Sequence, residues 1–189
     1  MKKCWYRLNI DVSKAISNDW KFPTPNDIDD RQVWPIEREN IFSQEWLEAM
    51  ETLGIPIAIG ILFYRRPCLI DDFAHVDLAG NPAEIVNCGF NWVISGEPGE
   101  MIWYDKPQQS GAFMPINSDG ESYLSWPISQ LQEIDRCVME KNQLILIRVD
   151  HPHAMINRSS YRWTISARSP VHLTTWDKIV NDYNHLLER

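Results

Sequence analysis

Residues 161–168 read Tyr-Arg-Trp-Thr-Ile-Ser-Ala-Arg and alternate between polar and apolar side chains. In an extended strand, successive side chains point to opposite faces of the sheet. One face of this strand therefore carries Arg162, Thr164, Ser166 and Arg168, and the other face is apolar. A polar face that includes planar guanidinium groups suits recognition of a carboxylate. A solvent-facing polar stripe on an antiparallel sheet has the same pattern, so both interpretations stand at this point.

The rest of the chain predicts a mainly β protein, organised as one domain over residues 1–189. Besides the strand just described, alternating or continuous apolar patterns predict strands at 4–12, 55–64, 84–94, 100–105 and 144–149. Residues 128–139 fit either a short helix or a strand. Many short strands with few helices are typical of a barrel or sandwich.

Helices are expected near the two ends of this β-rich region. Ser43 is a predicted N-cap for a helix that ends at about Gly54, and a second, C-terminal helix is expected at about 175–188. Two segments rich in turn-forming residues, 20–35 and 106–123, are expected to be loops. The second is long enough to be a functional lid.

Composition argues against several classes of partner. The net charge of -8 disfavours binding to a nucleic-acid backbone, since that affinity comes largely from Lys and Arg. No apolar run approaches the length of a membrane span, and a signal peptide is not expected. The four cysteines lack C-x-x-C spacing, which predicts reduced thiols in a cytoplasmic protein. Nine tryptophans either fill a wide core or line a pocket.

A His-x-Asp pair, His75 and Asp77, precedes the second half of the predicted strands. In an extended segment this spacing places an imidazole and a carboxylate on one side. The pair alone is common by chance, and a surface loop accounts for it equally well. With one distant histidine, it would form a set of two His and one carboxylate that leaves three positions of an octahedral metal open. His151 and His153, on either side of Pro152, are both candidates for that histidine.

These segments together resemble the Fe(II)/2-oxoglutarate-dependent dioxygenases, in particular small bacterial or phage members, with a fainter likeness to aspartyl/asparaginyl β-hydroxylases. The resemblance covers about residues 57–168. It rests on five segments, at 73–77, 91–94, 101–104, 152–157 and 162–168. It implies a double-stranded β-helix, which is a cupin-like jelly-roll barrel, with a few flanking helices and iron at its mouth.

The resemblance also implies roles for particular residues. His75, Asp77 and His153 match the metal ligands of the family. Arg162 matches the basic residue that pairs with the far carboxylate of 2-oxoglutarate, and Thr164 stands where many members keep a hydroxyl for the same carboxylate. By this likeness His153 is favoured over His151, and Arg162 over Arg168.

Three further residues, Asn91, Trp103 and Tyr104, are candidates for the lining of the pocket. Each lies on a predicted strand next to the presumed site in the family's arrangement. Packing in the core accounts for all three equally well, so their assignment to the site depends on which way each strand faces.

The resemblance implies an oxygenase that uses Fe(II), 2-oxoglutarate and O₂ to hydroxylate an unactivated C–H bond, with succinate and CO₂ as co-products. The substrate is expected to be a small molecule or a peptide side chain, without nucleic acid or membrane. One alternative is a cupin-like isomerase or dioxygenase that uses the metal without 2-oxoglutarate. Another is a non-catalytic barrel that binds a ligand. The intact ligand set argues against it, because converging buried polar groups are costly without a metal.

Overall fold

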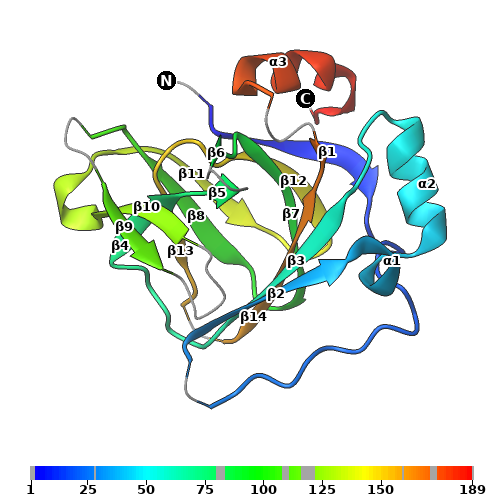
Figure 1. Ribbon diagram of the computed structural model, residues 1–189, viewed down its shortest axis with the longest axis horizontal. Coiled ribbons are helices and arrows are strands. Elements are labelled where there is room, and N and C mark those ends of the chain that lie inside the picture. Colours follow the sequence, from blue (N-terminus) through cyan, green and yellow to red (C-terminus); the bar gives the residue numbers. More distant parts are fainter. Residues whose placement is uncertain are drawn as a thin grey trace.

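The computed structural model describes residues 3–188, except residues 28, 80–83, 108–110, 116–121, 159 and 171–173. Most strands belong to two six-stranded antiparallel sheets (Figure 1). The first sheet contains, in spatial order, β1 (Trp5–Asp11), β12 (Gln143–Arg148), β7 (Cys88–Gly96), β14 (Arg162–Arg168), β3 (Ile59–Arg65) and β2 (Arg31–Glu37). The second contains β11 (Glu133–Met139), β8 (Gly99–Tyr104), β13 (His153–Ile156), β4 (Phe73–Val76), β10 (Ser122–Pro127) and β9 (Ala112–Pro115). A short pair, β5 (Leu78–Ala79) and β6 (Glu84–Ile85), lies apart from both.

Eight of these strands form a jelly roll. The chain passes from β3 in the first sheet to β4 in the second, returns to β7, and crosses again to β8. From β8 the chain stays in the second sheet as far as β11, and it then changes sheet at each step, to β12, β13 and β14. The result is the order β12-β7-β14-β3 in one sheet and β11-β8-β13-β4 in the other. The predicted double-stranded β-helix, or jelly roll, is therefore confirmed.

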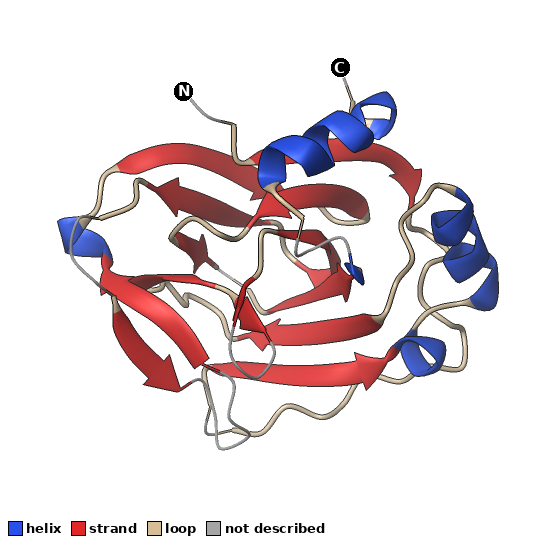
Figure 2. Ribbon diagram, turned by 45° about the horizontal axis from the view of Figure 1, so that its top comes forward, coloured by secondary structure: helices blue, strands red, loops and turns tan. Residues whose placement is uncertain are grey.

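The helices lie outside the barrel, as Figure 2 shows. They are α1 (Arg38–Ile41), α2 (Gln44–Thr52) and α3 (Trp176–Asp182), with single 3₁₀ turns at Ile128–Gln130 and Asn184–Leu186. Apolar residues of α2 and α3 pack on the outward-facing side chains of β7, β12 and β14 in one hydrophobic cluster. None of the helices in the described part of the chain is both long and apolar enough to cross a membrane.

The predicted N-cap of α2 is confirmed, because the Ser43 side chain accepts a hydrogen bond from the backbone N–H of Trp46 at 3.2 Å. The C-terminal helix is shorter than expected. It ends at Asp182, and a 3₁₀ turn follows in place of the last predicted turns. The ambiguous segment 128–139 contains both alternatives, a 3₁₀ turn followed by strand β11.

The two predicted loops were wrong in part, because each contains an edge strand. Residues 20–35 include the start of β2, and residues 106–123 include β9 and the start of β10. Within the described residues, β2 pairs only with β3 and β9 only with β10. An edge strand tolerates Pro35, which has no N–H to donate, and such a strand lacks the regular pattern of a central one. Residues 108–110 and 116–121 of the second segment lie outside the described residues.

The inside of the barrel is apolar on one side and polar on the other. The apolar side is a cluster contributed by β7, β8, β11 and β12, and it includes Val93, Trp103 and Ile145. The polar side faces it from β4, β13 and β14. On β7, Asn91 faces into the barrel. Its neighbours Phe90 and Trp92 face outward and pack under the helices. Polar side chains are therefore gathered in one part of the interior.

Candidate metal centre

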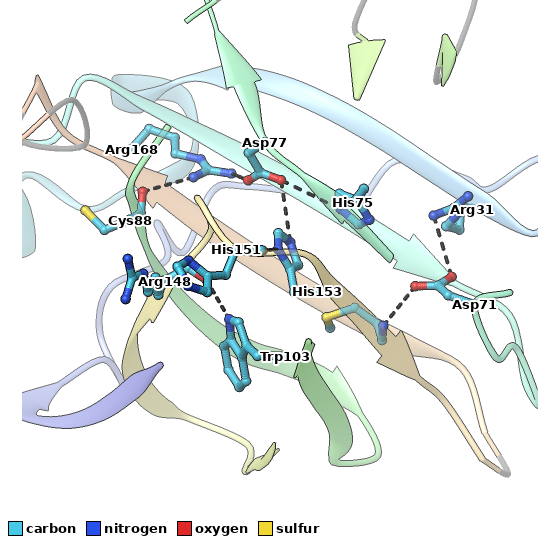
Figure 3. A network of polar contacts seen from close by, with 11 residues as sticks. Arg31, Asp71, His75, Asp77, Cys88, Trp103, Arg148, His151, His153 and Arg168 are labelled. Carbon is cyan, nitrogen blue, oxygen red and sulfur yellow. Dashed lines mark hydrogen bonds and ion pairs between the residues drawn. The ribbon is translucent and has the colours of Figure 1, made fainter. Parts of the chain in front are cut away.

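His75, Asp77 and His153 offer three potential metal-ligand atoms that all lie within 4.8 Å of one another. Oδ1 of Asp77 is 3.7 Å from Nε2 of His75 and 3.5 Å from Nε2 of His153 (Figure 3). Bonds of about 2.1 Å to one octahedral ion would place neighbouring ligand atoms about 3 Å apart. The two distances to Oδ1 of Asp77 are about 0.5–0.7 Å wider than this, so a movement of the side chains would bring the three atoms to one ion.

Strand pairing brings the two histidines together. His153 on β13 lies directly opposite His75 on β4, and their ring centroids are 4.4 Å apart. Residues directly opposite each other in an antiparallel pair point to the same face of the sheet. The register of β4 against β13 therefore creates the pair of imidazoles from residues 78 positions apart in the sequence.

Asp77 follows the last residue of β4, and two backbone hydrogen bonds hold it there. Its N–H donates to the carbonyl of Val149 at 3.2 Å, and its carbonyl accepts from the N–H of Val86 at 3.0 Å. Val149 follows β12 of the first sheet. The carboxylate ligand is therefore attached to both sheets at the rim of the barrel.

The imidazole rings are oriented as metal binding requires. Nδ1 of His153 lies 3.0 Å from the carbonyl oxygen of His151, which can only accept a hydrogen bond. Nδ1 therefore carries a proton and Nε2 is the nitrogen directed at Asp77, as is usual for metal-bound histidines. Burial, together with the neighbouring His153, lowers the pKa of His75 to about 3. His75 is therefore neutral at physiological pH.

Asp77 is ionised despite its position. Burial raises the pKa of this carboxyl, but the charge and the hydrogen bond of the Arg168 guanidinium lower it, and the pKa ends below its ordinary value. Arg168 donates from Nη2 to Oδ2 of Asp77 at 2.6 Å and from Nη1 to the carbonyl of Cys88 at 3.2 Å. Arg168, the rival candidate for anchoring an anion, is thus engaged by the carboxylate of the centre itself.

His151 does not join the cluster. Its Nδ1 lies 3.4 Å from Oδ1 of Asp150, and Asp150 also receives two hydrogen bonds from Arg148, at 2.5 and 3.0 Å. The three side chains form a separate polar group at the rim. His151 contacts the centre through its backbone carbonyl alone, at least among the contacts of described residues.

Arg162 is a cation inside the barrel. Its side chain is 0% exposed, and no residue in the described part of the chain accepts a hydrogen bond from any of its three guanidinium nitrogens. Burial and the neighbouring Arg65 lower the pKa of Arg162 to about 9, so it remains charged at neutral pH. A buried charge without hydrogen-bonding partners costs several kcal/mol (~3 or more), which an anionic ligand would offset.

Further polar groups on the inner faces of β7 and β14 also lack partners. They are Oγ1 of Thr164, Oγ of Ser166 and Oδ1 of Asn91, none of which has a hydrogen bond in the described structure. Ser166 lies directly opposite Asn91 in the pairing of the two strands. The two hydroxyls lie between Arg162 and Arg168 along β14, so the polar face continues from the candidate metal centre to the buried arginine.

Trp103 and Tyr104 separate onto the two faces of β8. Trp103 lies opposite His153, points into the barrel, and donates from Nε1 to the carbonyl of Arg148 at 2.6 Å. Tyr104 packs on the other face, with Ala74 and Ala154. The expectation that Tyr104 contacts the cofactor therefore does not agree with this placement, because alternation along β8 directs it away from the histidines.

Two glycines that were not among the predicted site residues leave space for the arginines of the site. A Cβ on Gly99 would overlap Nη1 of Arg162, and a Cβ on Gly89 would lie 3.0 Å from both Nη1 of Arg168 and Oδ1 of Asn91. Both arginines therefore occupy space that any larger residue would fill. A glycine inside or at the start of a predicted strand signals such close approach, although it does not identify the partner.

Comparison with known proteins gives matches of fold only. The sequence matches no protein-family model, and no curated protein matches it significantly. The structure is similar to vicilin from Corylus avellana (hazelnut), with a TM-score of 0.38 and 9% identity, over 84% of this chain and 31% of vicilin. It is also similar to ycfD from E. coli, with a TM-score of 0.42 and 12% identity, over 98% of this chain and 46% of that chain. The chain thus spans less than half the length of either protein, and both similarities concern the course of the chain alone.

Proposed function

We propose that this protein is an Fe(II)- and 2-oxoglutarate-dependent oxygenase that hydroxylates a C–H bond of a small molecule or a peptide side chain. The observation that carries the proposal is Arg162, a buried cation with no hydrogen-bonding partner among the described residues. It lies on the strand whose last residue, Arg168, contacts the metal-ligand candidate Asp77. A metal centre and an unsatisfied cation on one polar wall suit a ligand that has a chelating end and a distant carboxylate.

The residues present fit a divalent metal. Two neutral imidazoles and one carboxylate form the set that non-haem Fe(II) enzymes use, with three positions left for other ligands. His153 has the required tautomer because its Nδ1 faces the carbonyl of His151. A bound metal would pair with all three polar groups that converge here inside the barrel.

The residues present also fit the far carboxylate of 2-oxoglutarate. A guanidinium binds a carboxylate through two parallel hydrogen bonds, and a buried pair of this kind is strong because water does not compete. The Thr164 hydroxyl has no hydrogen bond in the described structure and is two residues from Arg162 on the same face. In this proposal it would donate a third hydrogen bond to the carboxylate.

In this proposal the protein supplies binding, orientation and a dry cavity. Bound Fe(II) with 2-oxoglutarate would supply the oxidation of a C–H bond by O₂, with succinate and CO₂ as co-products. His75, Asp77 and His153 would hold the ion, and Arg162 would orient the co-substrate. Trp103, fully buried beside His153, would exclude water from this side of the ion.

The direct test is succinate formation from 2-oxoglutarate by protein reconstituted with Fe(II), with and without a panel of small molecules and peptides. Turnover that disappears in His75→Ala and Asp77→Ala is expected. The absence of turnover in metal-loaded wild-type protein across the panel would contradict the proposal.

A binding measurement separates this function from that of a metalloenzyme without 2-oxoglutarate. Arg162→Met is expected to weaken 2-oxoglutarate binding by at least about 30-fold, equivalent to about 2 kcal/mol, and to leave metal affinity unchanged. Arg148→Met is the matched control, because Arg148 is also a largely buried arginine but faces Asp150. Equal 2-oxoglutarate affinity in the wild type and Arg162→Met would favour the metalloenzyme alternative.

A further inference from the structure

Arg168 bridges the metal-ligand candidate Asp77 and the backbone of the neighbouring strand. It is the last residue of β14, and its guanidinium donates to Oδ2 of Asp77 at 2.6 Å and to the carbonyl of Cys88 at 3.2 Å. Figure 3 shows the guanidinium on one side of the carboxylate and the two imidazoles on the other. The arginine therefore contacts the oxygen that faces away from His75 and His153.

The two oxygens of Asp77 have different surroundings. Oδ1 lies near both imidazole Nε2 atoms, whereas Oδ2 is engaged by Arg168. Arg168 donates a hydrogen bond to Oδ2 of this side chain at 2.6 Å. A carboxylate turns readily about its Cβ–Cγ bond, so this contact selects which oxygen points into the barrel.

The backbone at the start of β7 leaves space for the Arg168 guanidinium. A Cβ on Gly89 would lie 3.0 Å from Nη1 of Arg168, closer than side-chain contacts normally allow. The carbonyl of Cys88, the preceding residue, accepts from the same Nη1 atom. The start of β7 thus provides both the space and an acceptor for the guanidinium.

We propose that Arg168 is a positioning residue for the metal centre, which holds Oδ2 of Asp77 so that Oδ1 alone serves as the ligand. This inference rests on the metal centre of the proposed function. A carboxylate bound through one oxygen occupies a single position on the ion. It leaves the remaining positions to the co-substrate and O₂.

Charge and geometry predict opposite effects of Arg168 on metal affinity, which makes the proposal testable. A positive charge so close to the centre repels a divalent cation, so its removal should strengthen metal binding if charge dominates. Loss of an outer hydrogen-bonding partner of a metal ligand typically weakens binding about 10- to 100-fold. The sign of the change therefore identifies the role.

The experiment is a double-mutant cycle between Arg168→Met and Asp77→Ala, read out as Zn(II) affinity by competition with a chromophoric chelator. Zn(II) is suitable because two imidazoles still bind it when Asp77 is removed. We expect Arg168→Met to weaken Zn(II) binding by about 10- to 100-fold in the wild-type background. In the Asp77→Ala background, it should no longer weaken Zn(II) binding, since no carboxylate remains to be positioned.

Two more variants separate geometry from charge. Arg168→Lys keeps the charge but cannot contact Cys88 and Asp77 together, and it is expected to weaken Zn(II) binding as well. Gly89→Ala is expected to act in the same direction by displacing the guanidinium. Arg148→Met is the matched control, since the side chains of Arg148 and Arg168 are both 11% exposed and both pair with an aspartate.

Each outcome has a defined meaning. Unchanged or stronger Zn(II) binding in Arg168→Met would overturn the proposal, and so would an equal loss in both backgrounds of the cycle. Melting curves of the metal-free variants show whether a loss comes from unfolding; if Arg168→Met is unfolded, Gly89→Ala and Arg168→Lys decide the question. Failure of the wild-type protein to bind Zn(II) or Fe(II) would contradict the proposed function instead.

Discussion

The Nδ1 atom of His153 lies 3.0 Å from the carbonyl oxygen of His151, so these two histidines are linked through the backbone of one and the side chain of the other. The contact fixes the tautomer of His153 and leaves its Nε2 directed at Asp77. The side chain of His151 points to Asp150 and takes no part in this link. The two histidines, which are equivalent in the sequence pattern, therefore have different relationships to the candidate metal centre.

The first prediction concerns this pair. His153→Ala should reduce Zn(II) affinity by at least about 100-fold, because it removes a ligand, which costs more than the loss of an outer partner. His151→Ala should change affinity by less than about threefold, because the carbonyl that accepts from Nδ1 is retained. Isothermal titration with Zn(II) measures both. Similar losses in the two variants would contradict this assignment, because they would show that the His151 side chain also contributes to metal binding.

The second prediction concerns Gly99, which leaves space for Arg162. Gly99→Ala should destabilise the protein by about 1–3 kcal/mol, because the new methyl group overlaps the Arg162 guanidinium, which must shift. It should also weaken 2-oxoglutarate binding by displacing Arg162. Urea denaturation gives the free energy of unfolding. In an Arg162→Met background the cost of Gly99→Ala should fall, since the overlapping group is gone; additive costs would show that Arg162 is not the cause.

The third prediction concerns Asp71, a buried carboxylate away from the candidate centre. Its Oδ1 pairs with Arg65 at 2.8 Å, and its Oδ2 accepts from the N–H of Met155 at 2.9 Å. Burial raises the pKa of Asp71, but Arg65 and Arg31 lower it by more, to below its ordinary value. The stabilisation is therefore complete above the pKa of an unfolded aspartate, about 3.9, and is lost as pH falls through the lower folded value.

Asp71→Asn should accordingly lower the free energy of unfolding by about 3 kcal/mol at pH 7, because it removes the negatively charged partner of the buried Arg65. The difference between the wild type and Asp71→Asn should shrink as pH falls below about 4, where the carboxylate takes up a proton in the unfolded chain before it does so in the folded protein. Urea denaturation at pH 7 and pH 3 measures it. A difference that is the same at both values would mean that the charge of Asp71 does not contribute.

The fourth prediction concerns the cap of α2. Ser43→Ala should destabilise the protein by about 1 kcal/mol, because the N–H of Trp46 loses its acceptor at the helix end. Ser43→Asn should retain most of the stability, since asparagine is an equally good N-cap. Thermal unfolding of the two variants provides the comparison. An equal loss in both would indicate that the hydrogen bond from Ser43 to the carbonyl of Lys14, at 2.7 Å, is the important contact.

Local patterns were sufficient for much of the fold because they depend on the geometry of a single element. The alternation from Arg162 to Arg168 predicts which side chains share a face, since a strand repeats every two residues. The cap at Ser43 depends on hydrogen bonds within one helix turn. The edge strands β2 and β9 were not predicted, because pairing with a single neighbour stabilises them without a regular apolar pattern.

Whether these faces meet at one site depends on the register between strands that are far apart in the chain. The pairing of His153 with His75 sets the centre, and the same register turns Trp103 inward and Tyr104 outward. A shift of one residue would reverse every one of these directions. The sequence alone therefore identifies the residue types of a candidate metal centre and a candidate anion anchor. Closure of the barrel decides whether these residues converge, because long-range strand pairing alone sets which polar groups share the interior. The same closure leaves the Arg162 guanidinium without a hydrogen-bond acceptor among the described residues and brings Arg168 into contact with Asp77.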